Sequence, residues 1–477
     1  MKTERAGPSL SLDLNLTMKL ITFHASWLSI VIAISASDPL FDSTYAKQDI
    51  IVRDVAVIGG GATGTYAAIN LRKLNQSVVL VEREAILGGH TNTYTDTATQ
   101  STLDYGVQAY WNLSVTRDYF AHLDIPITNW KPEPKTAVYT DFKTGKQVEV
   151  RTSSNYSAYI QQLDKYSWLE YSWNQGHPVP DDLVLPFRDF VAKYNLVDIA
   201  YTAYFSCQGF ANILDQLTIN VIKFFDKSYI GALTGDYVAT KQHKNDEIYV
   251  RAKAELGQDA LTSSTVIASK RSKTGVQLVV KTPSGKKLIR ARKLLISMPT
   301  RMSDMKPFDV DGKESKVFSQ WRYSAYYVML VRNTGLPAGH KFLNADPSTT
   351  RFNIPQLPAP YQITETRVPG LFYVWYSAPK EMTQSEVQAD VTTIIKRLQD
   401  TVNGATKTSP EFVRFNSHTP FKMVVSADSL NDGFYSELFG LQGYRSTWYT
   451  GAAMMSHSAG VLWNYTSHLL PEMIAAP

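Results

Sequence analysis

The hydrophobic positions near the start of the folded chain form two short runs with a helical segment between them. Residues 55–58 and 76–81 are small or β-branched apolar residues, a pattern typical of buried strands. Residues 65–73 can form a helix between these strands. The order strand, helix, strand predicts a βαβ unit, the building block of nucleotide-binding α/β folds.

Later segments predict a helical region and a second sheet. Apolar side chains in residues 181–194 recur at helical spacing, and residues 111–241 are interpreted as a helical cap rich in aromatic rings. Those rings either line an apolar cavity or fill a core. Apolar and polar residues alternate in 326–331 and 371–376, which predicts a mixed sheet, and residues 386–398 predict an amphipathic helix on its outside.

Four more strands are predicted between these two regions. Residues 264–268 form one strand, and 275–282 and 287–291 form a hairpin around a Pro-Ser-Gly turn. Residues 293–298 are expected to be a separate buried strand that a proline ends.

A glycine motif lies between the first strand and its helix. Gly59, Gly61 and Gly64 fit the G-x-G-x-x-G pattern. The first glycine permits a tight turn, the second lets the backbone approach a pyrophosphate, and the third lets the helix pack closely on the sheet. The amide groups at the start of the helix would face the phosphate oxygens, and Ala62 and Thr63 of the motif are also expected to bind the cofactor.

An acidic residue completes this motif. Glu82 ends the second strand, roughly 20 residues after the glycines, where a carboxylate can accept hydrogen bonds from ribose hydroxyls. A carboxylate there also disfavours a 2′-phosphate, so NADP is not expected. A glycine-rich turn without a ligand would leave this Glu unexplained, and the motif therefore predicts a dinucleotide site.

Three further segments resemble parts of the flavin-dependent amine oxidase superfamily. Leu87-Gly88-Gly89-His90-Thr91 resembles its L-G-G-R-x-x-T segment, which contacts the FAD diphosphate and the flavin edge, and residues 104–107 resemble its D-x-G-A segment. Residues 447–453, followed by Gly460 and Val461, resemble the strand, glycine and helix that cover the isoalloxazine. The resemblance implies FAD rather than NAD, with these further cofactor-binding residues: Gly88, Gly89, His90, Val266, Gly451, Ala452, Gly460 and Val461.

Gly-Gly-His in place of Gly-Gly-Arg makes the chain most similar to the β-cyclopiazonate dehydrogenase-type flavoproteins of fungal secondary metabolism. More distantly, it resembles flavin-dependent polyunsaturated fatty acid isomerases. The resemblance implies an α/β fold with a Rossmann-type, glutathione-reductase-like FAD-binding domain and a discontinuous α+β substrate domain with a helical cap. The expected boundaries are 50–110, 242–302 and 442–477 for the FAD-binding domain, and 111–241 and 303–441 for the substrate-binding and cap domain.

The chain departs from the amine oxidase pattern in two places. Amine oxidases carry a lysine at the start of a strand in the second half, where Tyr326 or Tyr327 is expected here, while Lys313 and Lys316 lie upstream. Amine oxidation that forms hydrogen peroxide is therefore not expected. His90 replaces an arginine and is either a weaker hydrogen-bond donor or a covalent attachment point for the flavin.

These features predict an FAD-dependent oxidoreductase that oxidises a small apolar secondary metabolite by hydride transfer to the flavin, with or without oxidative cyclisation. A redox-neutral double-bond isomerase acting on a polyunsaturated lipid is the alternative, and a non-catalytic flavoprotein is the third class. Trp448 and Tyr449 either flank the substrate or pack behind the flavin. No general base is identified, and His457 is interpreted as a structural hydrogen-bond partner.

Composition limits the remaining possibilities. The chain has 477 residues, of which 44% are hydrophobic, enough for a large core and two or more domains. A net charge of +5 without a dense basic run does not favour nucleic-acid binding. Cys207 is the only cysteine, so an intrachain disulfide is excluded and a cysteinyl flavin link is not expected. The histidines show no metal-ligand spacing, and no metal is expected.

The amino end is interpreted as a secretory signal peptide over residues 1–37, with Met18 as a plausible true start. Its apolar stretch is shorter than the roughly 20 residues of a membrane span, although an uncleaved anchor stays an alternative. The chain is therefore expected in the secretory pathway or outside the cell, as a glycoprotein with sequons at Asn75, Asn112, Asn155 and Asn464.

Overall fold

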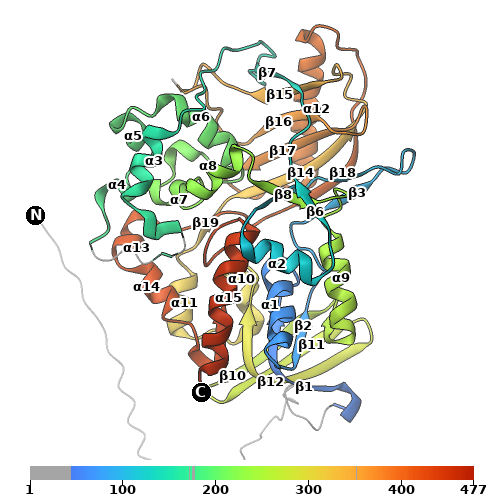
Figure 1. The fold of residues 1–477 in the computed structure, drawn as a ribbon, viewed down its shortest axis with the longest axis vertical. Coiled ribbons are helices and arrows are strands. Elements are labelled where there is room, and N and C mark those ends of the chain that lie inside the picture. The colour runs from blue at the N-terminus through green and yellow to red at the C-terminus, as the bar shows by residue number, and fades with distance from the viewer. Residues whose placement is uncertain (1–44, 171, 174–177, 351) are drawn as a thin grey trace, which may run out of the picture. The chain divides into compact units, whose positions relative to one another are not determined.

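A computed structural model describes residues 45–170, 172–173, 178–350 and 352–477 (Figure 1). The predicted signal peptide lies outside these residues. Within them, no helix has both the length and the apolar character that crossing a bilayer requires.

A seven-stranded sheet contains the predicted βαβ unit. Strand β1 (Ile50–Ile58) pairs in parallel with β2 (Val78–Val81) on one side and with β12 (Gly285–Ile296) on the other. Helix α1 (Ala62–Lys73) connects β1 to β2, which confirms the predicted order of elements. The remaining strands are β9 (Ala260–Leu261) beside β2, β20 (Thr447–Tyr449) beside β12, and β10 (Thr265–Ser272) and β11 (Gly275–Thr282) at the antiparallel edge.

The prediction of separate strands at 287–291 and 293–298 was wrong, because residues 287–296 all belong to β12, which ends at Ile296. Strand β1 pairs with β12 without interruption from Leu288 to Ile296, and this continuous partner keeps the chain extended. The first half of β12 also pairs with β11, and its last three residues pair with β20. One strand therefore links the hairpin to the parallel part of the sheet.

Burial explains why this sheet lies at the centre of its domain. Val55, Ala56 and Val57 of β1 are fully buried, and so are Val79 and Leu80 of β2. Helix α1 packs against α9 (Glu247–Leu256) and α15 (Ala459–Ala475), and α15 also contacts α2 (Ser114–His122). Figure 1 shows these helices beside the strands in the lower part of the view.

The second sheet has six strands in the order β18-β14-β17-β16-β15-β7. The predicted segments 326–331 and 371–376 correspond to its neighbouring strands β14 and β17, and the predicted amphipathic helix is α12 (Gln384–Thr401), whose buried face includes Val387, Val391 and Ile395. The strands are β7 (Thr136–Thr140), β14 (Ala325–Arg332), β15 (His340–Asn344), β16 (Ala359–Glu365), β17 (Phe372–Ala378) and β18 (Glu411–Ser417).

The predicted helical cap consists of short helices (Figure 1). The prediction of one continuous helix over 181–194 was wrong, since α4 ends at Val184 and α5 begins at Phe187. The break occurs because Pro186 disfavours a helical conformation at Leu185, the residue before it. The cap helices are α3 (Ser157–Asp164), α4 (Asp181–Val184), α5 (Phe187–Lys193), α6 (Val197–Ser206), α7 (Thr218–Ile222) and α8 (Lys227–Leu233).

Short elements connect these layers. They are β3 (Thr93–Thr95), β4 (Thr102–Asp104), β5 (Tyr110–Trp111), β6 (Ile127–Asn129), β8 (Tyr237–Thr240), α10 (Met302–Met305), α11 (Gly312–Phe318), β13 (Arg322–Tyr323), β19 (Met423–Val424), α13 (Ala427–Asn431) and α14 (Phe434–Phe439). The expected division into an FAD-binding domain and a substrate domain stays a prediction.

Candidate cofactor and substrate site

The turn between β1 and α1 requires glycine at the motif positions. Gly59 has a φ of +100°, and a Cβ atom on Gly64 would lie 1.9 Å from the carbonyl oxygen of Gly59. A Cβ on Gly61 would meet only the Cα of Gly89, at 3.6 Å. No side chain therefore covers the turn backbone on the side that faces Gly89. A turn that binds a diphosphate needs such an uncovered backbone.

Two helices begin at this site without side-chain caps. Helix α1 begins at Ala62, its N-cap is Gly61, and its first turn, which includes Thr63, has no acidic residue. The 17-residue helix α15 begins at Ala459 in the same way, since its Ser458 cap makes no side-chain hydrogen bond. Both leave unpaired amide groups and a partial positive charge, which fit a phosphate and the electron-rich edge of a flavin.

Glu82 is held at the end of β2. Its side chain is 8% exposed, and its two carboxylate oxygens accept hydrogen bonds from the amides of Gly60 at 2.5 Å and Glu84 at 2.8 Å. The backbone amide of Ser264 donates to the Glu82 carbonyl at 2.8 Å, which brings Val266, two residues later in β10, to this strand end. The Glu82 end of the motif and the predicted strand 264–268, which contains Val266, therefore lie next to each other.

The second glycine loop joins the same turn. The amide of Gly88 donates to the carbonyl of Gly60 at 2.9 Å, and a Cβ on Gly89 would lie 2.9 Å from the Cα of Gly61. A Cβ on Gly106, in the segment that resembles D-x-G-A, would lie 2.1 Å from the carbonyl oxygen of His90. Close backbone contact thus explains why glycine occurs in each of these segments.

Ser297 connects the first turn to the C-terminal segment. Its hydroxyl donates to the carbonyl groups of Ile58 at 2.9 Å and Gly59 at 3.1 Å. Gly451 has a φ of +98°, and a Cβ there would lie 2.6 Å from the Ser297 carbonyl oxygen. Gly451 and the following Ala452 therefore lie against the end of β12, beside the glycine motif, as the resemblance implies for a segment that covers the flavin.

Three histidines that are far apart in the sequence meet next to these loops. The rings of His90 and His418 are stacked, with centroids 4.2 Å apart and an interplanar angle of 13°. The Phe421 ring lies 5.7 Å from His90 and 4.2 Å from His457. We call His90, His418, Phe421 and His457 the histidine–phenylalanine cluster.

The histidines of this cluster are neutral near pH 7. Burial lowers the pKa of His418 and His457 well below the usual value, and it lowers the pKa of His90 to about 4. The side chain of His90 is nevertheless exposed to water, although protein atoms surround it. The described residues include no group of three or more His, Cys, Asp or Glu side chains that could hold a metal ion.

Hydrogen bonds fix two of these rings. The Nε2 atom of His418 lies 2.9 Å from the side-chain oxygen of Asn92, and the Nε2 atom of His457 donates to the Phe421 carbonyl at 2.8 Å. His457 thus has the structural role predicted from the sequence, while its buried Nδ1 has no hydrogen-bond partner among the residues that the structure describes. No sequence pattern indicated the cluster, because its members come from three distant segments.

The two tyrosines at the expected lysine position face opposite sides of β14. Tyr326 lies 4.9 Å from the Phe421 ring and 5.9 Å from the His418 ring, and its hydroxyl donates to the Gln208 side chain at 2.7 Å. Tyr327 packs against Tyr376 instead. Tyr326 is therefore the residue that meets the cluster where amine oxidases have a lysine.

The upstream lysines are surface residues. Both lie in the short helix α11, as expected for that segment. Lys313 donates to the Gly440 carbonyl at 3.2 Å, and Lys316 forms an ion pair with Glu437. Neither contacts the cluster.

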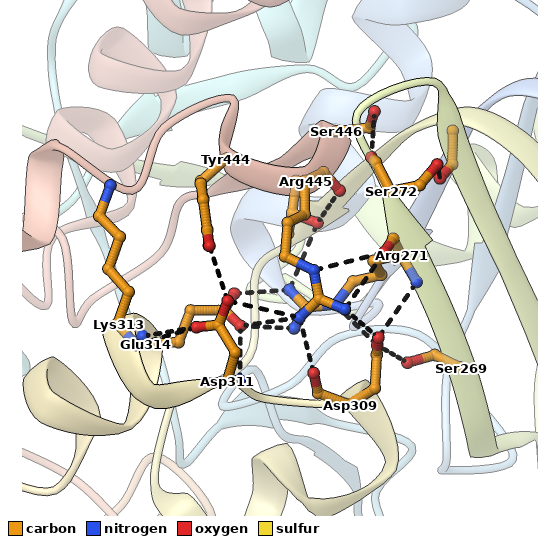
Figure 2. Close-up of polar contacts among 12 residues, drawn as sticks. Ser269, Arg271, Ser272, Asp309, Asp311, Lys313, Glu314, Tyr444, Arg445 and Ser446 are labelled. Carbon is orange, nitrogen blue, oxygen red and sulfur yellow. Dashed lines mark hydrogen bonds and ion pairs between the residues drawn. The ribbon is translucent and has the colours of Figure 1, made fainter.

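Tyr449 contacts a buried charge network, of which Figure 2 shows Arg271, Glu314 and Asp309. Its hydroxyl donates to Glu314 at 2.6 Å, and Glu314 accepts two hydrogen bonds of 2.6 Å from the guanidinium group of Arg271. Arg271 and Glu314 have fully buried side chains, and Asp309 and Arg445 extend the network towards solvent. These residues carried no pattern in the sequence, and together they anchor the segment that leads into β20.

Trp448 faces the other side of β20. Its side chain is 4% exposed, and the Lys293 ammonium lies 5.4 Å from its ring. Trp448 and Tyr449 both contact the protein interior. Of the two roles considered from the sequence, packing and flanking the substrate, these contacts correspond to packing.

Comparisons with known proteins agree with this geometry. An NAD(P)-binding Rossmann-like domain matches residues 57–123. The chain is 40% identical to the FAD-dependent oxidoreductase pigF of Monascus ruber, over 94% of this chain and 97% of that protein. It is 33% identical to β-cyclopiazonate dehydrogenase of Aspergillus oryzae, over 90% of this chain and 94% of that enzyme.

Solved structures show the same fold. A CLA-producing fatty acid isomerase from P. acnes has a TM-score of 0.69 at 15% identity, and covers 88% of this chain and 98% of its own. Wild-type putrescine oxidase bound to putrescine has a TM-score of 0.64 at 13% identity, and covers 89% of this chain and 100% of its own. At these identities the likeness concerns the fold alone. With the relatives above, it confirms both the predicted fold class and the resemblance, and the chain belongs to the family of FAD-dependent oxidoreductases that includes β-cyclopiazonate dehydrogenase.

Proposed function

We propose that this oxidoreductase dehydrogenates a small, largely apolar secondary metabolite by hydride transfer to the flavin, with or without ring closure. The supporting observation is the contact between the cofactor loops and the histidine–phenylalanine cluster, since His90 directly follows Gly88 and Gly89 and stacks on His418. Bound FAD supplies the electron-accepting ring, and the protein supplies position and electrostatics.

The residues of the cluster favour an apolar substrate. Three neutral imidazoles and the rings of Phe421 and Tyr326 give flat, weakly polar surfaces on which an aromatic or unsaturated molecule can stack. The name of β-cyclopiazonate dehydrogenase, a relative 33% identical to this chain, supports dehydrogenation as the type of reaction.

Anaerobic mixing of the FAD-loaded enzyme with a panel of apolar aromatic metabolites, β-cyclopiazonate included, tests the proposal. A substrate should bleach the visible absorbance of the flavin and give a product that is two hydrogens lighter. A product of unchanged mass would favour the isomerase alternative. Absence of bleaching across the panel would contradict dehydrogenation.

A matched pair of variants tests whether the cluster is the substrate surface. Tyr326→Leu should slow flavin reduction and weaken substrate binding, because Tyr326 contacts the cluster. Tyr327→Leu, on the opposite face of the same strand, should lower stability but leave the reduction rate of the folded enzyme unchanged. Equal effects of both variants on that rate would refute the assignment.

We infer that FAD is bound without a covalent link and that His90 donates a hydrogen bond to it. With a pKa lowered to about 4, the imidazole is neutral and offers one N–H group, a weaker donor than the arginine it replaces. Denaturing gel electrophoresis should show no flavin fluorescence on the protein band. Fluorescence that stays on the band and disappears in His90→Ala would establish attachment instead.

We also propose that the protein enters the secretory pathway and is glycosylated at exposed sequons. Asn75 and Asn155 are exposed, whereas Thr466 of the Asn464 sequon is fully buried. Full-length protein expressed in a eukaryotic host should increase its gel mobility after treatment with peptide N-glycosidase F. Unchanged mobility would argue against the proposal.

A further inference from the structure

Lys422 is a buried cation at the edge of the histidine–phenylalanine cluster. Its residue is 2% exposed and follows Phe421 directly. Its backbone amide donates to the Ser324 hydroxyl at 3.3 Å, and its carbonyl accepts from the Ser324 amide at 3.2 Å. The base of the side chain is therefore held in place, and only the position of the ammonium group can adjust.

The ammonium group lies among aromatic rings. It is 4.6 Å from the ring centroid of Phe210 and 5.8 Å from that of Trp173. Across the described part of the chain, its Nζ atom forms no hydrogen bond and no ion pair. Ring faces stabilise a cation only partly, and none of the described residues accepts a hydrogen bond from the three N–H groups of Lys422.

A second buried lysine of the cap shows the contrast. Lys223 is 1% exposed, and its Nζ donates to the carbonyl groups of Leu169 at 2.5 Å, Ser172 at 3.2 Å and Glu170 at 3.3 Å. Three backbone acceptors satisfy that side chain completely. The described residues thus provide hydrogen-bond acceptors for the Lys223 ammonium group but none for that of Lys422.

The titratable groups that face Lys422 supply no negative charge. Burial raises the pKa of the Cys207 thiol above its usual value, and burial lowers the pKa of His457, so both are neutral near pH 7. Burial lowers the pKa of Lys223 to about 7, and the carboxyl group of Asp226 acts on Lys223 in the opposite direction. Burial lowers the pKa of Lys422 itself to about 8, where the charged form still predominates at neutral pH.

An unpaired buried charge costs several kcal/mol, and such groups occur where a ligand supplies the partner. Phe421 connects Lys422 to the proposed substrate surface, because its ring contacts both His90 and His457. His457 also experiences the charge of Lys422. The cation therefore lies beside His457 and Phe210, whose rings are 6.1 Å apart at the edge of the cluster.

We propose that Lys422 binds an anionic oxygen of the substrate, so that the enzyme selects apolar molecules carrying one acidic group, such as a carboxylate or an ionised enol. This inference rests on the proposed function, since it assigns the cluster to the same substrate. The apolar body of the molecule stacks on Phe421 and Phe210, and the acidic oxygen accepts hydrogen bonds from the Lys422 ammonium group.

Binding of a matched pair of probes to the FAD-loaded enzyme tests this site without turnover. trans-Cinnamate and cinnamamide have the same shape, but only cinnamate is an anion. Calorimetry, together with the perturbation of the flavin spectrum, should show that cinnamate binds about tenfold or more tightly than the amide, as a charge-assisted hydrogen bond provides. The preference should decline as the pH rises above about 8, because Lys422 then loses its proton.

Variants identify the residue responsible. Lys422→Met, of similar length, should remove the preference for cinnamate and leave cinnamamide binding unchanged, and Lys422→Arg should retain part of the preference. Lys223→Met should keep it, because that side chain is already satisfied by carbonyl groups. The FAD content and thermal unfolding of each variant show whether the protein is folded and the site intact. If Lys422→Met does not fold, the comparison is made with Lys422→Arg.

Equal binding of the two probes by the wild-type enzyme, or a preference that survives in Lys422→Met, would overturn the proposal. Failure of the dehydrogenation assay does not affect these binding results, so the two hypotheses can fail separately.

Discussion

Replacement of Gly64 by alanine tests the close approach of α1 to the sheet. The added Cβ would lie 1.9 Å from the Gly59 carbonyl oxygen and 2.5 Å from the Ser297 hydroxyl. A carbon atom contacts its neighbours at about 3.5 Å or more, so α1 and the turn must separate by roughly 1.6 Å. The contact involves backbone, and no side-chain rotation can relieve it.

The size of the effect follows from this displacement. Overpacking a tight contact destabilises a protein by about 1–3 kcal/mol. The displaced segments are the glycine turn and the N-terminus of α1, which would hold the FAD diphosphate. We therefore expect FAD to bind about 10- to 100-fold more weakly, since each 1.4 kcal/mol corresponds to a factor of ten.

Gly231→Ala is the matched control. This glycine lies in helix α8, and a Cβ there would meet no atom within 4 Å. The same chemical change should stabilise the protein by about 0.4–1 kcal/mol and leave FAD affinity unchanged. FAD titration of the apoprotein, followed by flavin fluorescence, and thermal unfolding measure both effects. Wild-type affinity and stability in Gly64→Ala would refute the assignment of this turn as the cofactor site.

Three other predictions concern charged residues. Arg271→Met and Glu314→Leu should each lower the free energy of unfolding by about 3–5 kcal/mol in urea denaturation, because each removes one partner of a fully buried ion pair, and the double variant should lose less than the sum. Glu82→Ala should weaken FAD about tenfold but leave FMN, which lacks the adenosine ribose, unaffected in direct titrations. Burial raises the pKa of Asp104 to about 7, so this group contributes stability at low pH that is lost as the pH rises through 7. Asp104→Asn should flatten that loss between about pH 4 and pH 7 in thermal unfolding, and an unchanged pH profile would contradict the shift.

Much of the fold could be predicted because its signals are local. The βαβ unit, the mixed sheet and helix α12 each follow from the periodicity of a continuous segment. Two errors in the predictions had tertiary or local steric causes. Pairing with β1 merges two predicted strands into β12, and Pro186 divides a predicted helical run into α4 and α5.

The cofactor site is specified by local sequence. The glycines, Glu82 and the second glycine loop lie in one short stretch, and their chemistry depends on backbone shape and on residue order. These local features predict a dinucleotide site, and the resemblance of residues 87–91, 104–107 and 447–453 to the amine oxidase superfamily implied FAD.

Tertiary packing was needed to bring together the stacked His90 and His418, the unpaired Lys422 and the buried pair of Arg271 and Glu314. In each case the chemistry arises from distant segments that meet, or from burial that removes water from a charge. Neither the contact nor the desolvation leaves a periodic or local pattern in the sequence, because both are properties of the packed chain.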